Sequence, residues 1–243
     1  MERSSPPSRT DERGPMATAF VALAMTPDDA VDLDAQLNKL AQMVVDRVDA
    51  VDYASVTAAR DGAYATVATT SELATAVDQA QYEDQNGPCL QSFEESSPIG
   101  VRSIDTTIKW PGFRQAALAM GLHASVSIPL FSGSGDTIAA LNLYGRDAAA
   151  MAPLIAGIPA IFDPDLPLPA DRDDLQPLDA GGEELLTGFA EALAARSTIQ
   201  LALGIIMGHT GTQTKDAYIA LRLRAADAGV PLLTAAETVI TER

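Results

Sequence analysis

The stretch that decides the fold is EELLTGFAEALAARSTIQLALGIIMGHTGTQTKDAYIALRLRAADAGVPLLTAAETVITER, residues 183–243. Three runs with apolar residues at steps of three and four follow one another, separated by two short glycine-containing breaks. That period is typical of amphipathic helices, so the segment predicts an all-α three-helix bundle. A bundle this small is usually too weak to form an enzyme core, but it is the right size to bind a partner.

The first of these helices is expected to be long. Residues 183–207 form one uninterrupted helical pattern, which at ~1.5 Å per residue extends over roughly 38 Å. A small bundle cannot cover a helix of that length, so part of its apolar stripe is expected to meet another chain or the preceding domain. Gly208 and Gly211 end this pattern, and Gly229-Val230-Pro231 separates the second helix from the third.

The chain before the bundle has an α+β pattern. A helix is expected within 28–48, where leucines and valines recur at helical spacing, and the runs 53–60 and 63–70 around Asp61-Gly62 predict a β-hairpin. Further expected elements are helices at 71–81, 89–95 and 113–120, and strands at 98–104, 124–131 and 137–144. The pattern predicts helices on an antiparallel sheet of about five strands.

Composition changes again between this region and the bundle. Residues 145–182 contain six prolines and seven aspartates against two arginines, and this proline density argues against a continuous helix. We therefore expect four segments: a disordered N-terminal segment 1–15, an α+β domain 16–150, a proline-rich acidic linker 151–182, and the helical domain 183–243. Met16 is an alternative translation start that the sequence does not settle.

The net charge of −17 is unevenly distributed. Residues 183–243 hold seven acidic and five basic residues, a balance of −2, so the remaining 182 residues carry −15. An acidic body repels anionic partners, so a nucleic acid would have to meet the C-terminal part. A single cysteine, no signal peptide and apolar runs far shorter than a membrane span indicate a cytosolic protein.

The C-terminal residues resemble a known family. Arg196-x-x-Ile199-x-x-Ala202-x-Gly204-Ile205-Ile206-Met207, then Ala217-Tyr218-x-x-Leu221-Arg222, then Ala236 with Val239-Ile240 are similar to the ANTAR domain, a three-helix RNA-binding module of bacterial transcription antiterminators. The resemblance covers about 55 residues. It departs at Leu203, where the family commonly has a lysine, and at Gly229-Val230, where it tends to have an asparagine.

The first domain resembles a GAF domain of the actinobacterial kind that precedes ANTAR. The resemblance is carried by Asn86-Gly87-Pro88-Cys89, Trp110-Pro111-x-Phe113, the stretch Gly121–Leu130, and Ala140–Tyr144. The family usually has a helix after the last strand, and in this chain we expect the proline-rich stretch 145–182 to replace it.

The resemblance implies a two-part regulator that catalyses nothing. A GAF domain would sense a signal, an unknown small molecule being one option. It would control an ANTAR domain that binds RNA stem-loops in nascent transcripts and dimerises through the long helix 183–207. No cofactor is implied, and the sequence shows no phosphate-binding loop, dinucleotide fingerprint or zinc pattern.

Candidate site residues follow from these expectations. The RNA-binding candidates are Arg196, Gly204, Lys215, Arg222 and Arg224, because guanidinium groups bind phosphate bidentately and stack on unpaired bases. Arg222 and Arg224 are about 200° apart on a helix and are expected to point different ways. The GAF ligand candidates are Tyr82, Cys89, Phe93, Trp110 and Phe113, with plain core packing as the alternative.

Two alternatives stay open. The chain could be a ligand-sensing GAF dimerisation protein that has lost RNA binding, which Leu203 and the overall acidity favour. It could also be an enzyme centred on Cys89 and His123, because a helix N-terminus such as the one expected at Cys89 favours a thiolate. The signal and the RNA targets are not encoded in any pattern that we recognise.

Overall fold

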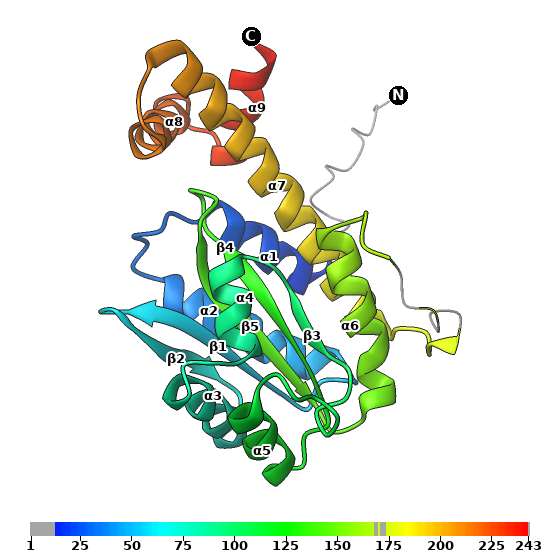
Figure 1. Ribbon diagram of the computed structural model, residues 1–243. Helices are drawn as coiled ribbons and strands as arrows, with labels where there is room; N and C mark the ends of the chain where they lie inside the picture. The colour runs from blue at the N-terminus through cyan, green and yellow to red at the C-terminus, as the bar shows by residue number, and fades with distance from the viewer. Residues whose placement is uncertain (1–12, 168–169, 171–173, 243) are drawn as a thin grey trace, which may run out of the picture.

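The computed structural model describes residues 13–167, 170 and 174–242 (Figure 1). Five strands form one antiparallel sheet in the order β2-β1-β5-β4-β3. They are β1 (Tyr53–Arg60), β2 (Ala63–Thr69), β3 (Ile99–Val101), β4 (Ala124–Phe131) and β5 (Thr137–Gly145). The α+β fold expected from the sequence is confirmed, as are the two hairpins β1–β2 and β4–β5.

The two faces of the sheet differ in chemistry because side chains alternate along each strand. In β4, Val126 and Ile128 belong to the large apolar core, whereas Ser125 and Ser127 point to the other face and are also buried. In β1 and β5 the same alternation places Ser55, Thr57, Asn142 and Tyr144 opposite the apolar core. One face therefore carries the main hydrophobic core and the other a buried polar layer.

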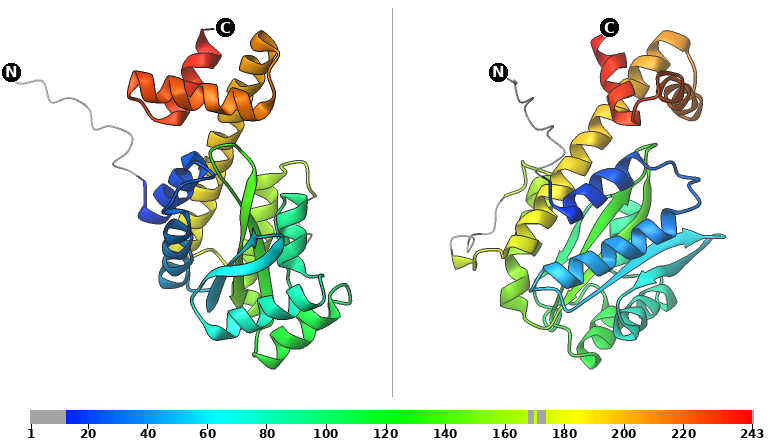
Figure 2. Two further views of the ribbon diagram at one scale, coloured as in Figure 1. Left: turned by 90° about the vertical axis from the view of Figure 1, so that its left-hand side faces the viewer. Right: turned by 180° about the vertical axis from the view of Figure 1, so that it is seen from behind.

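Four helices pack on the apolar face: α1 (Pro15–Met25), α2 (Leu33–Arg47), α6 (Ala148–Phe162) and the first half of α7 (Ala180–Thr210). Figures 1 and 2 show α1 lying along α7. Gly188 makes this approach possible, because a Cβ at this position would lie 2.7 Å from the Cα of Ala17. The part of the α7 stripe that the bundle cannot cover thus meets the preceding domain, which was one of the two expected outcomes.

The polar face is covered by α3 (Glu72–Glu83), α4 (Pro88–Glu95) and α5 (Pro111–Ala119). Ser71 caps α3 as expected, since its side-chain oxygen accepts a hydrogen bond from the N–H of Leu73 at 3.2 Å. These helices position the chain's single cysteine, Cys89, in the first turn of α4.

The expectation that proline would prevent a continuous helix after β5 was wrong. Helix α6 runs through Pro153 and Pro159, and Asp147 caps its start by accepting hydrogen bonds from two N–H groups. Six of its residues, including Leu154 and Ile158, are buried, and this packing outweighs the two backbone hydrogen bonds that proline removes. The last strand is therefore followed by a helix, not by a linker alone.

Helix α1 was missed, because residues 1–15 were expected to be disordered and 16–27 carried no prediction. Residues 1–12 lie outside the described part. Arg13 forms an ion pair with Glu191 at 2.6 Å, and Pro15 opens the helix. The remaining domain boundaries stay a prediction.

Helix α7 extends from the N-terminal domain into the bundle (Figures 1 and 2). Leu185 and Phe189 are buried in the N-terminal domain, and Ile199 and Leu203 are buried against α8 (Thr214–Ala228) and α9 (Leu232–Thr241). The expected three-helix bundle is present. By length and composition alone, α7 is also long and apolar enough to cross a membrane. Its use as a core helix of both domains accounts for that apolar character.

Candidate functional site

The cations of the bundle do not all face solvent. Arg196 is half-buried between α7 and the β4–β5 hairpin, where its Nε donates a hydrogen bond to the carbonyl of Gly135 at 2.7 Å. Its guanidinium also lies over the ring of Phe131, 4.0 Å from the centroid. Burial lowers the pKa of Arg196, and the carboxylate of Asp136 acts in the opposite direction. This RNA candidate is therefore held by the N-terminal domain.

Arg222 and Lys215 on α8 face the same domain. Nη1 of Arg222 lies 3.2 Å from Oδ1 of Asp29, which belongs to the loop between α1 and α2. A cleft of about 670 Å³ lies at this junction. It is lined by Asp28, Asp29, Ser134, Asp136, Thr214, Lys215, Tyr218, Ile219 and Arg222. Two of the five RNA candidates, Lys215 and Arg222, thus line this cleft together with three aspartates.

Tyr218 sits at the centre of this junction. It is 7% exposed, and its hydroxyl is buried without a hydrogen-bond partner. Desolvation by burial, reinforced by Asp28, raises its pKa to about 12. Gly133 makes room for it, because a Cβ there would be 2.7 Å from the Tyr218 hydroxyl. The packing between the two domains is close, but this hydroxyl is left unsatisfied.

The other two RNA candidates lie elsewhere. Arg224 is exposed and lines a second groove, between α7 and α9, with His209 and Glu242. Arg222 and Arg224 therefore point to different grooves, as their spacing predicted. Gly204 is exposed on α7, and a Cβ there would meet nothing within 4 Å. It therefore makes no close helix packing within this chain.

The two departures from the family pattern have different meanings. Leu203 is 2% exposed in the bundle core, so its side chain replaces a lysine with core packing and offers no phosphate contact. Gly229 ends α8 with φ +65°, a left-handed conformation that glycine and asparagine both adopt. Glycine in place of asparagine at this break therefore keeps a left-handed backbone conformation that both residues can adopt.

The five ligand candidates of the N-terminal domain fall into two groups. Trp110 and Phe113 pack edge-to-face at 6.4 Å in a small apolar cluster with Ile104 and Leu122. This placement fits core packing, the alternative left open for them, although the Nε1 atom of Trp110 is buried without a hydrogen-bond partner. Tyr82, Cys89 and Phe93 lie on α3 and α4, and Tyr82 donates or accepts hydrogen bonds with Thr57 and Thr66, each at 2.9 Å. Tyr82 and Cys89 adjoin the buried polar layer, and Phe93 packs edge-to-face on Tyr64 at 5.6 Å.

Asp78 is the centre of that layer, and sequence reasoning missed it. It is fully buried on α3, where it accepts hydrogen bonds from Tyr144 at 2.6 Å and Thr66 at 2.9 Å. Desolvation by burial raises the pKa of this carboxyl to about 6, although the hydrogen bonds act to lower it. The Oδ1 atom of Asn142 and the hydroxyl of Ser125 are buried in the same layer without a hydrogen-bond partner. Such unsatisfied acceptors and donors are positions where a bound polar molecule gains the most.

Cys89 lacks the features of a nucleophile. Its side chain is buried, and burial together with the carboxylate of Asp78 raises the pKa of the thiol well above its usual value. The thiolate that a helix N-terminus would favour is therefore disfavoured here. His123 is exposed just before the start of β4. This arrangement gives no support to a Cys89–His123 enzyme.

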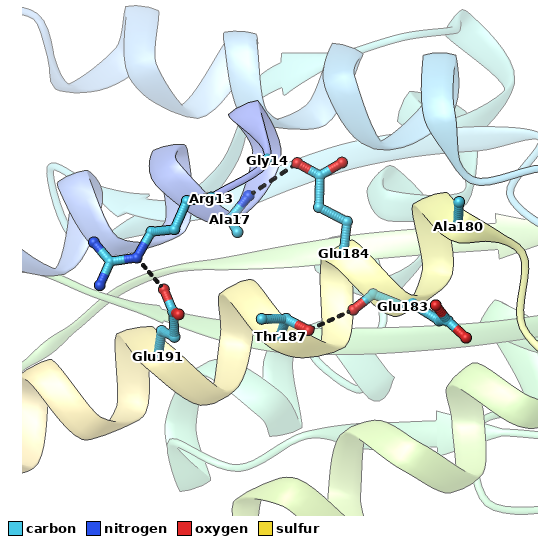
Figure 3. Close-up of a pocket in the computed structure, with 8 residues that line it drawn as sticks. All are labelled: Arg13, Gly14, Ala17, Ala180, Glu183, Glu184, Thr187 and Glu191. Carbon is cyan, nitrogen blue, oxygen red and sulfur yellow. Dashed lines mark hydrogen bonds and ion pairs between the residues drawn. The ribbon is translucent and has the colours of Figure 1, made fainter. Parts of the chain in front are cut away.

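A third groove, of about 640 Å³, runs between the start of α1 and the start of α7 (Figure 3). Two of its three carboxylates have partners: Glu184 accepts hydrogen bonds from the N–H groups of Met16 at 2.7 Å and Ala17 at 3.4 Å, and Glu191 pairs with Arg13. The groove is a structural junction between the two helices. Among the residues that the structure describes, no cluster of three or more His, Cys, Asp or Glu side chains could hold a metal ion.

Comparison with known families defines the C-terminal part: residues 188–240 match the model of the ANTAR domain. The bundle formed by the second half of α7, α8 and α9 is therefore an ANTAR domain. No curated protein matches the chain in sequence.

Two solved structures resemble the chain at low similarity, each with 13% sequence identity. One is a domain of a two-component sensor histidine kinase protein from Sinorhizobium meliloti 1021, with a TM-score of 0.39, covering 70% of this chain and 92% of that chain. The other is the type II free methionine-R-sulfoxide reductase from Thermoplasma acidophilum, with a TM-score of 0.35, covering 57% of this chain and 96% of that chain. Similarity this low says nothing of what the chain binds.

Sequence reasoning also missed Asp28, Asp29, Gly135 and Asp136, which hold or face the cations of the bundle. In the sequence they belong to two polar loops about 100 residues apart. No periodicity or motif indicates that both loops meet α7 and α8, because this proximity depends on how α7 docks.

Proposed function

We propose that the protein is a cytoplasmic RNA-binding transcription antitermination regulator. The observation that supports it most is the ANTAR match to a segment that has its own three-helix core. Arg196, Lys215, Arg222 and Arg224 would contact the phosphates and unpaired bases of RNA stem-loops, and the exposed backbone at Gly204 would allow a close approach. The N-terminal α+β domain would be a GAF-type sensor and not a catalyst.

The charge distribution supports RNA binding only at the bundle. Within 188–240 there are four acidic residues (191, 216, 227, 237) and four basic residues (196, 215, 222, 224), so this segment is neutral in a chain of net charge −17. Contacts to phosphates must then come from a few well-placed cations, and affinity should fall steeply with salt.

A homodimer through the long helix would let one protein hold two stem-loops. The first half of α7 is buried in its own chain, so the surface left for a partner is the exposed stripe of Ala194, Ser197, Leu201, Gly204 and Gly208. Leu201 is 52% exposed and shares this stripe with Gly204 and Gly208. Pairing would raise the RNA affinity by avidity rather than by new contacts.

The sensed signal would be a small polar molecule that reaches the buried layer around Asp78. The unsatisfied groups of Asn142 and Ser125, with Tyr82 and Cys89 beside them, support a site for a ligand that carries both hydrogen-bond donors and acceptors. Thermal shift measurements across a library of polar metabolites would test it. Asn142→Leu, which removes the orphaned oxygen, should abolish any shift that is found.

Gel-shift titration with an RNA that carries two tandem stem-loops tests the main proposal. The wild-type chain should bind this RNA more tightly than an RNA in which one loop is replaced by a continuous duplex. Arg224→Ala should weaken binding without changing the oligomeric state measured by light scattering. Equal binding to both RNAs, or no binding at all, would reject the proposal.

A second candidate is a ligand-sensing dimerisation protein that has lost RNA binding. The burial of Leu203, in the place of a lysine, is the observation that favours it. This candidate predicts that Leu201→Glu disrupts a dimer whereas no tested stem-loop RNA binds.

A further inference from the structure

Two loops of the N-terminal domain are joined into one unit beside the bundle. The hydroxyl of Ser132 donates a hydrogen bond to Oδ1 of Asp28 at 2.5 Å, and the N–H of Gly133 donates to the carbonyl of Thr26 at 2.7 Å. We call this unit, residues 26–29 and 132–136, the acidic rim. Figure 2 shows the β4–β5 hairpin, which carries 132–136, reaching α7 beneath α8.

The acidic rim and the adjoining Phe131 offer the bundle acceptor oxygens and an aromatic face, the two kinds of group that an RNA loop also presents to arginine. Arg196 receives a carbonyl oxygen from Gly135 and an aromatic face from Phe131. Arg222 receives a carboxylate from Asp29. Phosphate oxygens and unstacked bases would supply an equivalent set of acceptors and ring faces to the same guanidinium groups. A cation held by the rim is not free to hold RNA.

We infer that the acidic rim is an internal competitor of RNA: it occupies Arg196 and Arg222 until the two domains separate at this contact. The inference rests on the proposed RNA-binding function and names its regulation. It also accounts for the difference between the two arginines of α8: Arg222 pairs with a carboxylate of the N-terminal domain, whereas Arg224 lies in a groove formed by the bundle alone.

The contact between the acidic rim and the bundle has the properties of a contact that can open without unfolding either domain. The Asp29–Arg222 pair is exposed on both sides, at 76% and 41%, and exposed pairs contribute little to stability. The buried Tyr218 hydroxyl has no hydrogen-bond partner and recovers hydration when the contact opens. By contrast, α1 and the first half of α7 share a large apolar core, so opening at the rim does not require the domain junction to come apart.

The rim is also connected to the proposed sensor site. The hairpin 132–136 is the continuation of β4 and β5, the strands that carry Ser125 and Asn142 of the buried polar layer. A ligand that shifts these strands would act on the rim without an intermediate element.

The test uses the full chain with Asp28→Asn and Asp29→Asn combined. The matched control, Asp46→Asn with Glu72→Gln, removes the same two charges from exposed positions on α2 and α3. Tandem stem-loop RNA should bind the rim variant at least about fivefold more tightly than the control, the lower end of typical coupling between sites. Amide hydrogen exchange in 132–136 should be faster in the rim variant and unchanged in the control.

The outcomes are distinct. If wild type, control and rim variant all bind RNA with equal affinity, the inference is rejected and the proposed function stands. If none of them binds RNA, the proposed function fails and the inference fails with it. If the double variant does not fold, Asp29→Asn alone serves, because its 76% exposed side chain contributes nothing to a core. A smaller gain in the same direction supports the inference, and no gain over Asp46→Asn rejects it.

Discussion

The two ends of α7 lie in cores of very different depth. At the N-terminal end, Phe189 is 1% exposed and packs edge-to-face on Phe20 at 6.5 Å, within a core that draws on four helices and the sheet. At the C-terminal end, five of the eleven buried core residues of the bundle are alanine. Small side chains bury little area each, so the bundle is the less stable body. One helix thus joins a deeply packed N-terminal domain, which we call the platform, to a thinly packed bundle.

The largest effect should come from the platform. Phe189→Ala removes a large buried side chain and leaves a cavity, which costs about 3–5 kcal/mol. We expect the free energy of unfolding, measured with urea and circular dichroism, to fall by that amount. Leu193→Ala, a partly buried neighbour on the same helix, provides the control and should cost clearly less. Equal losses would mean that the deep core is not where the structure places it.

A core substitution in the bundle should destabilise the bundle and leave the N-terminal domain folded. Leu221 is fully buried in its thin core, and Leu221→Ala costs about 2–5 kcal/mol, as much as a unit of this size can hold. Hydrogen exchange should then show lost protection in α8 and α9 and retained protection in β4 and β5. A simultaneous loss in both places would show a single cooperative body and would remove the contrast between the two ends.

A pH dependence should appear in the platform and not in the bundle. The pKa of Asp78 is raised from 3.8 to about 6 in the folded state, so between these values the folded state binds more protons than the unfolded state. Stability from this group therefore falls as pH rises from about 4 to 6, by on the order of 2–3 kcal/mol in total.

The measurement is urea unfolding of wild type and Asp78→Asn across this range. Asparagine does not titrate, so wild type should lose stability relative to the variant as pH rises. A difference that stays constant, or grows in the opposite direction, would mean that the buried carboxyl is not raised. The protection of α8 and α9 should be equal in both proteins at every pH.

The smallest expected effect is a difference in RNA affinity between two variants of α8, Arg222→Ala and Arg224→Ala. Arg224→Ala should weaken RNA binding and reduce the slope of log affinity against log salt by about one. Arg222→Ala also removes an RNA contact, but it frees the bundle from Asp29, so its net loss should be smaller. A larger loss for Arg222 than for Arg224 would contradict the competition at the rim.

The sequence allowed us to predict the elements that local patterns determine. The strands of both hairpins, the Ser71 cap and the three helices of the bundle followed from periodicity and turn residues, as did the opposite directions of Arg222 and Arg224. Helix α6 could not be predicted from local rules, since Pro153 and Pro159 disfavour it and only burial of its apolar residues supports it. Helix α1 was missed for a similar reason: its sequence is apolar on most sides and gives no clear amphipathic period.

The candidate site was only half predictable. The cations could be named from a motif, but their partners could not. Asp29 and Gly135 meet Arg222 and Arg196 through contacts separated by 193 and 61 residues, which depend on how α7 docks on the N-terminal domain. Asp78 gave no signal because a single aspartate on a helix is usually solvated, and its burial follows from the polar face of a sheet assembled elsewhere.

The most direct test of competition at the rim follows hydrogen exchange in 132–136 of the wild-type chain while tandem stem-loop RNA is added. Because coupling between two sites is reciprocal, RNA that takes Arg196 and Arg222 must release the rim. We predict that exchange in 132–136 becomes faster as RNA saturates the protein, while exchange in β1 stays constant. Unchanged or slower exchange in 132–136 at saturation would contradict the account.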